Sequence, residues 1–133
     1  MRAPKKIPMP EESWPHFSRK ELECPCCGRM EMDDRFMQNV ERLRRWCNFS
    51  FRVGSAFRCP SYNAAVSVTG TSGPHTTGRA IDIIVSGEES YILLSRALKT
   101  GEFTGIGVKQ TGAHDKRFLH LDNLRKTEHA HRP

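Results

Sequence analysis

The most constraining feature of this 133-residue sequence is the run Gly-Pro-His-Thr-Thr-Gly-Arg-Ala-Ile-Asp at residues 73–82, which Phe-Leu-His-Leu-Asp follows far downstream. The two stretches supply two imidazoles, His75 and His120, and one carboxylate, Asp82. Such a set of nitrogen and oxygen donors suits a tetrahedral Zn²⁺ ion whose fourth position stays open for water. The pattern is typical of a catalytic metal site and differs from that of a structural one.

The local sequence explains how distant residues could meet. Residues 76–78 predict a turn and the apolar run 80–85 predicts a strand, so a ligand in the loop and a ligand in the strand can converge on one ion. His120 lies in a second apolar segment, in which side chains two residues apart share a face. We therefore expect His120 and Asp122 to point the same way, into the same cleft as Asp82 if the strands are neighbours.

These residues resemble the pattern of the M15-type zinc peptidases, S-x-H-x-x-G-x-A-x-D followed by a histidine on a late strand. That family has a hedgehog-like peptidase fold and includes D-alanyl-D-alanine carboxypeptidases, dipeptidases and phage endolysin peptidases that cut cell-wall peptides. The upstream run Ser-Ala-Phe-Arg-Cys-Pro-Ser-Tyr-Asn at residues 55–63 resembles the family segment with a substrate-binding arginine, here Arg58. The resemblance covers residues 17–125. It implies that the three donors bind zinc and that Arg58 binds substrate.

Two positions depart from the family pattern. The serine that usually stands two residues before the first histidine is replaced by Gly73, and Ser72, which we expect to contact substrate, lies one step further back. Several branches of the family place their general base three residues before the last histidine, where Arg117 stands here. The candidates for the base are Asp122, His114 and Asp115. Because Asp122 is equally suited to orient a ligand histidine, its role stays open between these two.

The chemistry implied by these residues is amide hydrolysis. Zinc in this site would polarise a peptide carbonyl and bring the pKa of its bound water toward ~7. Arg58 can hold a carboxylate through two parallel hydrogen bonds, which favours a carboxypeptidase over an endopeptidase. By resemblance, the substrate is a bacterial cell-wall peptide, cut at a D-Ala-D-Ala terminus or at an internal stem or cross-bridge bond. The alternative is a non-catalytic zinc-binding module of the same fold, acting as a structural or interaction protein, which the missing acid before His120 favours.

The cysteines suggest little beyond a turn. Their odd number, five, in a chain without a secretion signal favours reduced thiols over a disulfide framework. Cys24 and Cys27 form a C-x-x-C-G motif, the geometry of half a zinc knuckle. A second, structural zinc would need two more ligands, which Cys47, Cys59 or His16 would supply only by a coincidence of the fold. We therefore expect a cysteine-rich turn and a single catalytic zinc ion. A knuckle protein that binds nucleic acid would leave the His-Asp-His set unexplained.

The formal net charge of +6 implies attraction to polyanions, either nucleic acid or the teichoic acids and phospholipids of a bacterial envelope. We interpret much of it as solvated residues in the two tails and at Arg42, Arg44 and Arg45. No apolar run approaches the ~18 residues of a membrane span, and the first six residues lack the apolar stretch of a secretion signal. We expect a monomer that binds no nucleic acid, made in a cytoplasm and acting on the cell wall after release by another factor, as a phage or prophage enzyme would.

Apolar periodicity predicts the secondary structure. The three-and-four spacing over residues 32–47 predicts an amphipathic helix, and Ser18 with Glu21 three residues later predicts a capping box for a short helical turn. Strands are expected at residues 49–55, 80–85, 103–108 and 118–124, and further helices at 60–68, with Tyr62, Ala65 and Val66 inward, and at 91–98, stopping at Gly101. The two glycines of the third strand permit close approach of a neighbour.

These elements describe an α+β domain with a mainly antiparallel central sheet, helices packed on one face and zinc in a cleft. We expect residues 1–15 to form an extended N-terminal arm, residues 16–125 the M15-like peptidase domain, and residues 126–133 a disordered basic tail.

Overall fold

The computed structural model describes residues 13–124. Within them, the chain forms four α-helices and a four-stranded sheet, joined by three short 3-10 turns. The helices are α2 (Arg19–Leu22), α3 (Asp34–Cys47), α4 (Pro60–Val66) and α5 (Gly87–Thr100). The strands are β1 (Arg52–Ser55), β2 (Ala80–Ile84), β3 (Gly105–Lys109) and β4 (Phe118–Asp122), and the turns are η1 (Gly70–Ser72), η2 (Pro74–Thr77) and η3 (His114–Lys116).

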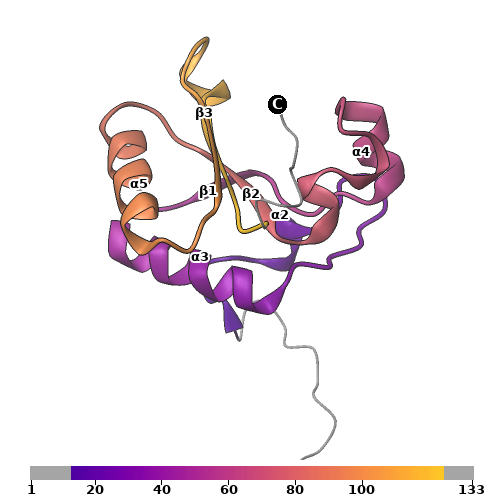
Figure 1. The fold of residues 1–133 in the computed structure, drawn as a ribbon, viewed down its shortest axis with the longest axis horizontal. Coiled ribbons are helices and arrows are strands. Elements are labelled where there is room, and N and C mark those ends of the chain that lie inside the picture. The colour runs from indigo at the N-terminus through magenta and orange to yellow at the C-terminus, as the bar shows by residue number, and fades with distance from the viewer. Residues whose placement is uncertain (1–12, 125–133) are drawn as a thin grey trace, which may run out of the picture.

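The sheet has the strand order β1-β2-β4-β3, and each neighbouring pair is antiparallel. It runs through the middle of the molecule, with α3 below it, α5 at one end and α4 at the other (Figure 1). The α+β class predicted from the sequence is therefore confirmed.

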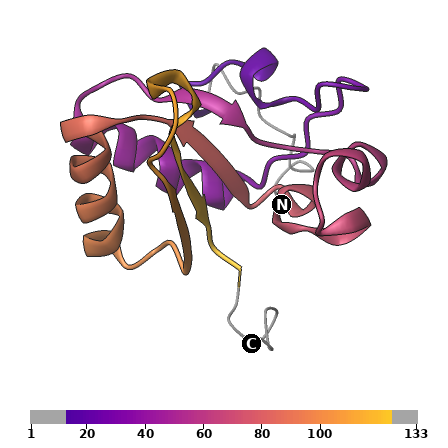
Figure 2. The same ribbon diagram turned by 90° about the horizontal axis from the view of Figure 1, so that it is seen from above.

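The two faces of the sheet carry different residues because side chains alternate along each strand. Ile81 of β2 and Leu121 of β4 are fully buried. Helices α3 and α5 pack against each other and cover this apolar face (Figure 2). They contribute Phe36, Met37, Val40, Leu43, Leu93 and Ala97 to the same core. Asp82 and His120, which alternate with these strand residues, therefore point to the opposite face.

Local capping signals set the ends of the helices. The side chain of Asp33 caps α3 by accepting a hydrogen bond from the backbone of the first turn, and the helix ends at Asn48 in the left-handed region. The predicted capping box between Ser18 and Glu21 is present at α2, and α5 ends at Gly101 with a φ of 70°. The capping box at α2 and the glycine stop of α5 are therefore confirmed.

Helix α4 departs from its prediction. It ends at Val66, and both Ala65 and Val66 are exposed, so the expectation that they face inward is wrong. The helix packs on η1 and η2 instead of the sheet. It is held there by the buried amide of Asn63, which donates to Oγ1 of Thr69 at 2.8 Å and to a backbone carbonyl of η1 at 2.6 Å. A helix fixed by a polar contact needs no continuous apolar face.

The core begins close to the N-terminal boundary of the described residues. Trp14 is 2% exposed, and its indole N–H donates to Oδ1 of Asp34 at 3.0 Å. A residue from the end of the segment predicted as an arm therefore belongs to the core. The rest of that arm and the predicted tail, residues 126–133, lie outside the described residues. In the described part of the chain, none of the helices combines the length and the apolar composition that crossing a bilayer requires.

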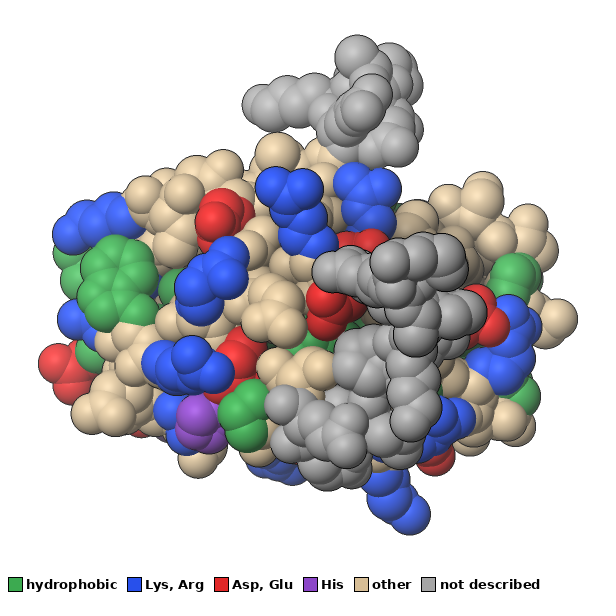
Figure 3. Space-filling view, turned by 90° about the horizontal axis from the view of Figure 1, so that it is seen from below, with side chains coloured by type: hydrophobic (Ala, Val, Ile, Leu, Met, Phe, Trp, Pro, Cys, Tyr) green, Lys and Arg blue, Asp and Glu red, His purple; other side chains and the backbone are tan. Residues whose placement is uncertain are grey.

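Two basic residues of α3 form ion pairs. Arg42 lies 3.6 Å from Glu102, and Arg45 lies 3.2 Å from Glu41. On the face shown in Figure 3, Lys and Arg side chains lie among acidic ones instead of forming one continuous patch. The pair of Arg42 with Glu102 is exposed and contributes at most ~1 kcal/mol, whereas Glu41 is buried beneath the exposed Arg45. We interpret the arginine charge itself as a solvated surface.

Candidate metal centre

His75 is the first of the three predicted donors. It lies in η2 and is 6% exposed. Its Nδ1 lies 2.7 Å from the carbonyl oxygen of Ala56, and a carbonyl oxygen can only accept a hydrogen bond. Nδ1 therefore donates to this carbonyl, and Nε2 faces Oδ1 of Asp82 at 3.4 Å. A hydrogen bond of this kind on the far nitrogen is the usual way in which a ligand histidine is oriented.

Asp82 and His120 meet through the register of the sheet. They lie directly opposite each other in the antiparallel pairing of β2 with β4. Nδ1 of His120 lies 2.8 Å from Oδ1 of Asp82. The pairs on either side are apolar and face the core, so burial of that face fixes the register that brings the two polar residues together.

The three donors fit one metal ion. One donor atom each from His75, Asp82 and His120 lies within 4.8 Å of the others. Bonds of ~2.0–2.2 Å to a tetrahedral Zn²⁺ place donor atoms ~3.3 Å apart. The 3.4 Å separation of His75 and Asp82 already matches this value, whereas the 2.8 Å between Asp82 and His120 is a hydrogen-bond distance that would lengthen when a metal replaces the proton. Two imidazoles and one carboxylate leave a fourth position open.

The electrostatics of the site favour a carboxylate beside a protonated imidazole when no metal is bound. Burial raises the pKa of Asp82, but hydrogen bonds from His120 and His75 outweigh it and lower this pKa to about 2. Burial lowers the pKa of His120, but hydrogen bonds to Asp122 and Asp82 outweigh it and raise this pKa to about 9. His120 therefore holds a proton at neutral pH at the place where a cation would bind.

Asp122 contacts the other side of the His120 ring. Its Oδ2 lies 2.8 Å from Nε2 of His120, the nitrogen that faces away from Asp82. Asp122 is buried, and Gly105 of β3 is its partner in the sheet. A Cβ at Gly105 would lie 2.3 Å from a carboxylate oxygen of Asp122, so only glycine leaves room for this carboxylate. The close approach predicted from the glycines of this strand is confirmed.

A cleft of about 390 Å³ opens beside Asp82 and includes Arg58. Nε of Arg58 donates to Oγ of Ser55 at 3.1 Å, and Nη1 donates to Oδ1 of Asn63 at 3.0 Å. Both partners are neutral, and among the described residues no acidic side chain forms an ion pair with Arg58. The guanidinium is thus held in place with its charge available to an anion. The cleft is lined by Arg52, Gly54, Ser55, Arg58, Asp82, Ile84, Asp115, Lys116 and Phe118.

The remaining predicted residues lie in different places. Asp115, in η3, lines the same cleft as Arg58 and Asp82. Its neighbour His114 is exposed and is not among the residues that line the cleft. Ser72, at the end of η1, is also exposed and outside the cleft lining. The structure thus brings Asp115 into one cleft with Arg58 and Asp82, but brings neither His114 nor Ser72 there.

A comparison with protein families decides the affiliation. Residues 15–122 match the model of the family described as Peptidase M15. The chain belongs to the peptidase M15 family. No match was found among curated proteins or among solved structures. The metallopeptidase family predicted from the sequence is therefore confirmed, and the His-Asp-His cluster is the candidate metal site of this M15 peptidase.

Two glycines explain the shape of the M15 motif in this chain. A Cβ at Gly73 would lie 2.1 Å from Oγ1 of Thr69 and 2.9 Å from Nδ2 of Asn63, so the serine of the family pattern has no room at that place. Gly78 has a φ of +77°, and a Cβ there would lie 2.0 Å from the carbonyl oxygen of Glu31. Glycine at this position lets the loop with His75 turn sharply into β2.

The cysteines of this M15 peptidase are arranged more closely than the sequence led us to expect. Cys24, Cys26, Cys27 and Cys59 each offer a sulfur atom within 4.8 Å of the others, and all are free thiols. Sequence reasoning paired only Cys24 with Cys27, overlooked Cys26, and treated Cys59 as a coincidence of the fold. Cys47 lies elsewhere, at the end of α3.

Proposed function

We propose that this M15 peptidase is a zinc-dependent hydrolase of bacterial peptidoglycan peptides, of the D,D-carboxypeptidase or endopeptidase type, encoded by a phage or prophage. The observation that carries the proposal is the meeting of His75, Asp82 and His120 beside a cleft that also contains Arg58, which has no acidic ion-pair partner within residues 13–124. As part of the same proposal, the protein is made in a cytoplasm and reaches the cell wall after release by another factor.

The three donors would hold the metal, and other residues would transfer the proton and bind the substrate. A bound Zn²⁺ ion would act as a Lewis acid toward the peptide carbonyl and activate water as the nucleophile. Asp115 is the carboxylate of the cleft lining that does not belong to the metal donors. We assign to it the role of general base, accepting the proton of the attacking water and returning it to the leaving amine.

Arg58 would bind the terminal carboxylate of the substrate. Its guanidinium is fixed by two neutral partners, Ser55 and Asn63, so it needs little reorganisation to form charge-assisted hydrogen bonds. An anion-binding group in the cleft suits a peptide with a free carboxyl end, which favours the carboxypeptidase form of the proposal.

Asp122 would be a positioning residue. It contacts the nitrogen of His120 that faces away from Asp82, so it can fix the ring orientation and raise the basicity of the metal-facing nitrogen. A base must instead reach the water in the cleft, and Asp122 is 4% exposed and absent from the cleft lining.

The test is hydrolysis by the zinc-loaded, full-length protein. Defined peptides ending in D-Ala-D-Ala and purified peptidoglycan serve as substrates, and mass spectrometry identifies the products. We expect cleavage that a chelator abolishes, that added zinc restores, and that His75→Ala eliminates. His114→Ala provides a matched control, because this histidine is exposed and outside the cleft lining. Full activity in His75→Ala would refute the proposal.

The second candidate is a non-catalytic zinc-binding module of the same fold. Arg117 favours it, since this residue stands where several branches of the family place an acid. Its Nε donates to the carbonyl oxygen of Gly112 at 2.9 Å, so it braces the turn before β4. Zinc-bound protein that cleaves neither substrate would support this module.

A further inference from the structure

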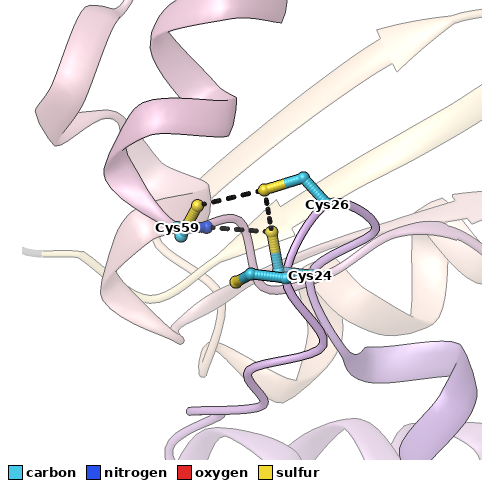
Figure 4. A group of neighbouring side chains, drawn as sticks. Cys24, Cys26 and Cys59 are labelled. Carbon is cyan, nitrogen blue, oxygen red and sulfur yellow. Dashed lines mark hydrogen bonds between the residues drawn. The ribbon is translucent and has the colours of Figure 1, made fainter.

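The four clustered cysteines form a second donor set, distinct from the candidate metal centre. Figure 4 shows three of them, Cys24, Cys26 and Cys59. The sulfur of Cys26 lies 3.6 Å from that of Cys24 and 3.4 Å from that of Cys59. These distances are far longer than a disulfide bond of ~2.05 Å. They are close to the ~3.8 Å between sulfur atoms that Zn–S bonds of ~2.3 Å give in a tetrahedron. We propose that Cys24, Cys26, Cys27 and Cys59 bind a structural Zn²⁺ ion.

The backbone around Cys24 is shaped for such a site. The N–H of Cys24 donates to the carbonyl of Arg29 at 2.7 Å, and the N–H of Gly28 donates back to the carbonyl of Cys24 at 2.9 Å. Gly28 has a φ of +76°, and a Cβ there would meet no atom within 4 Å, so glycine is needed for its conformation and not for space. The turn closes tightly enough for residues 24, 26 and 27 to offer their sulfurs to one point, as in a zinc knuckle.

Backbone donors face two of the sulfurs. The N–H of Cys59 lies 3.3 Å from Sγ of Cys24, and the N–H of Tyr62 lies 3.4 Å from Sγ of Cys59. Such donors stabilise the thiolate, which is the form that binds metal. Cys24 and Cys59 are buried whereas Cys26 and Cys27 are exposed. A metal can therefore enter from the exposed side and be shielded on the other.

The ion would connect two segments that are far apart in the chain. One is the loop of residues 24–27, and the other ends at Cys59, directly after residues that serve the metal centre. Ala56 orients the His75 ring, and Arg58 lines the cleft. With all four positions filled by sulfur, the ion offers no place for water, so its role is structural. It would fix the segment that carries Arg58 to the N-terminal part of the domain.

The experiment counts metal ions in the full-length protein. After reconstitution with zinc, native mass spectrometry and elemental analysis should find two zinc ions per chain in the unmodified protein. Cys59→Ser should retain one ion, and so should His75→Ala, each having lost a different one. Cys47→Ser is the matched control and should retain both, because this cysteine is buried outside the cluster.

Other results would overturn the assignment. These are a single ion that His75→Ala removes, iron in place of zinc, or a disulfide within the cluster, seen as a mass lower by two hydrogen atoms. A single ion that persists in His75→Ala but not in Cys59→Ser would support the cysteine site and count against the proposed hydrolase. Should Cys59→Ser fail to fold, cobalt substitution of the unmodified chain decides. Thiolate ligation gives intense sulfur-to-cobalt charge-transfer absorption, and its absence would contradict the proposal.

Discussion

The two histidines of the candidate metal centre turn different ring nitrogens toward Asp82, and fixed neighbours determine which. Ala56 engages Nδ1 of His75, so Nε2 faces Asp82. Asp122 engages Nε2 of His120, so Nδ1 faces Asp82. Because both rings are oriented from outside the site, the donor atoms already point at one another when no ion is bound.

The roles proposed for Asp115 and Asp122 predict different effects when each is substituted. We expect Asp115→Asn to lower kcat by roughly 10²–10⁴-fold at saturating zinc with unchanged zinc affinity, as for the loss of a general base. We expect Asp122→Asn to weaken zinc binding by about 10–100-fold, as for the loss of an orienting partner. Turnover and chelator competition, measured on both variants, distinguish the two. Lost turnover with intact zinc affinity in Asp122→Asn would instead identify Asp122 as the base.

Arg58 should determine how strongly the rate of hydrolysis depends on a free carboxyl terminus in the substrate peptide. Arg58→Ala removes charge-assisted hydrogen bonds that stabilise the bound substrate by about 2 kcal/mol. We therefore expect kcat/KM to fall by about 30-fold or more. Arg58→Lys should retain part of the activity, because it keeps the charge but not the fork geometry. Peptides with free and with amidated carboxyl termini provide the comparison. An equal loss on both would indicate that Arg58 does not bind the terminal carboxylate and would favour an endopeptidase.

Zinc binding at the metal centre should depend on pH through His120. Without metal, the pKa of His120 is raised to about 9, so the ion must displace one proton at neutral pH. The binding constant should rise about tenfold per pH unit and level off near pH 9. Asp82 adds nothing to this slope, since its pKa is lowered to about 2 and it is ionised throughout. Calorimetry of Cys59→Ser in buffers of different ionisation enthalpy measures the released proton; no release would contradict this account.

Among the elements, the outer strand β3 affects the candidate metal centre because Gly105 has no side chain beside Asp122. Gly105→Ala would place a Cβ 2.3 Å from the carboxylate of Asp122 and push it away from His120. We expect a loss of about 1–3 kcal/mol in stability and weaker zinc binding. Chemical unfolding and chelator competition test both effects. Val108→Ala, exposed on the same strand, is the control; an equal result for the two variants would contradict the prediction.

The sequence predicts the elements well where local rules decide. The cap at Ser18 and the stop at Gly101 lie where expected, and alternation along β2 and β4 correctly puts Asp82 and His120 on one face. Alternation also puts Asp122 on that face, but cannot tell which ring nitrogen it contacts. That distinction depends on the space beside Gly105.

Other features depend on contacts between distant segments. Sequence spacing gives no sign that Asn63, and not an apolar face, holds α4 in place and also supports Arg58. Likewise, Cys59 joins the cysteine loop because the N-terminal segment crosses the chain there, with the N–H of Phe57 bonded to the carbonyl of Leu22 at 3.2 Å. Periodicity carries no information about such crossings.

For the whole molecule, the two proposed zinc sites should both contribute to thermal stability. Zinc at about 1,000 times a Kd adds about 4 kcal/mol for one site, which corresponds to a rise in Tm of roughly 10 °C or more for a domain of this size. We expect the zinc-dependent rise to shrink in His75→Ala and in Cys59→Ser, and to vanish when both are changed. Scanning calorimetry with and without chelator measures it, and Cys47→Ser should behave as the unmodified chain. An undiminished rise in the double variant would show that zinc stabilises the protein elsewhere.

The direct pairing of Asp82 with His120 links refolding to metal capture. A slip of β4 by one residue along β2 would turn the leucines of β4 onto the open side and bury His120, while Asp82 stayed on the open side without its partner. A chain with the wrong register would then lack the pair of metal donors. A chain with the native register would bind the ion and be stabilised by it as soon as the two strands pair. Zinc present during renaturation would therefore select against mispaired sheets, so the yield of native protein should be higher when the metal is supplied before the chain closes.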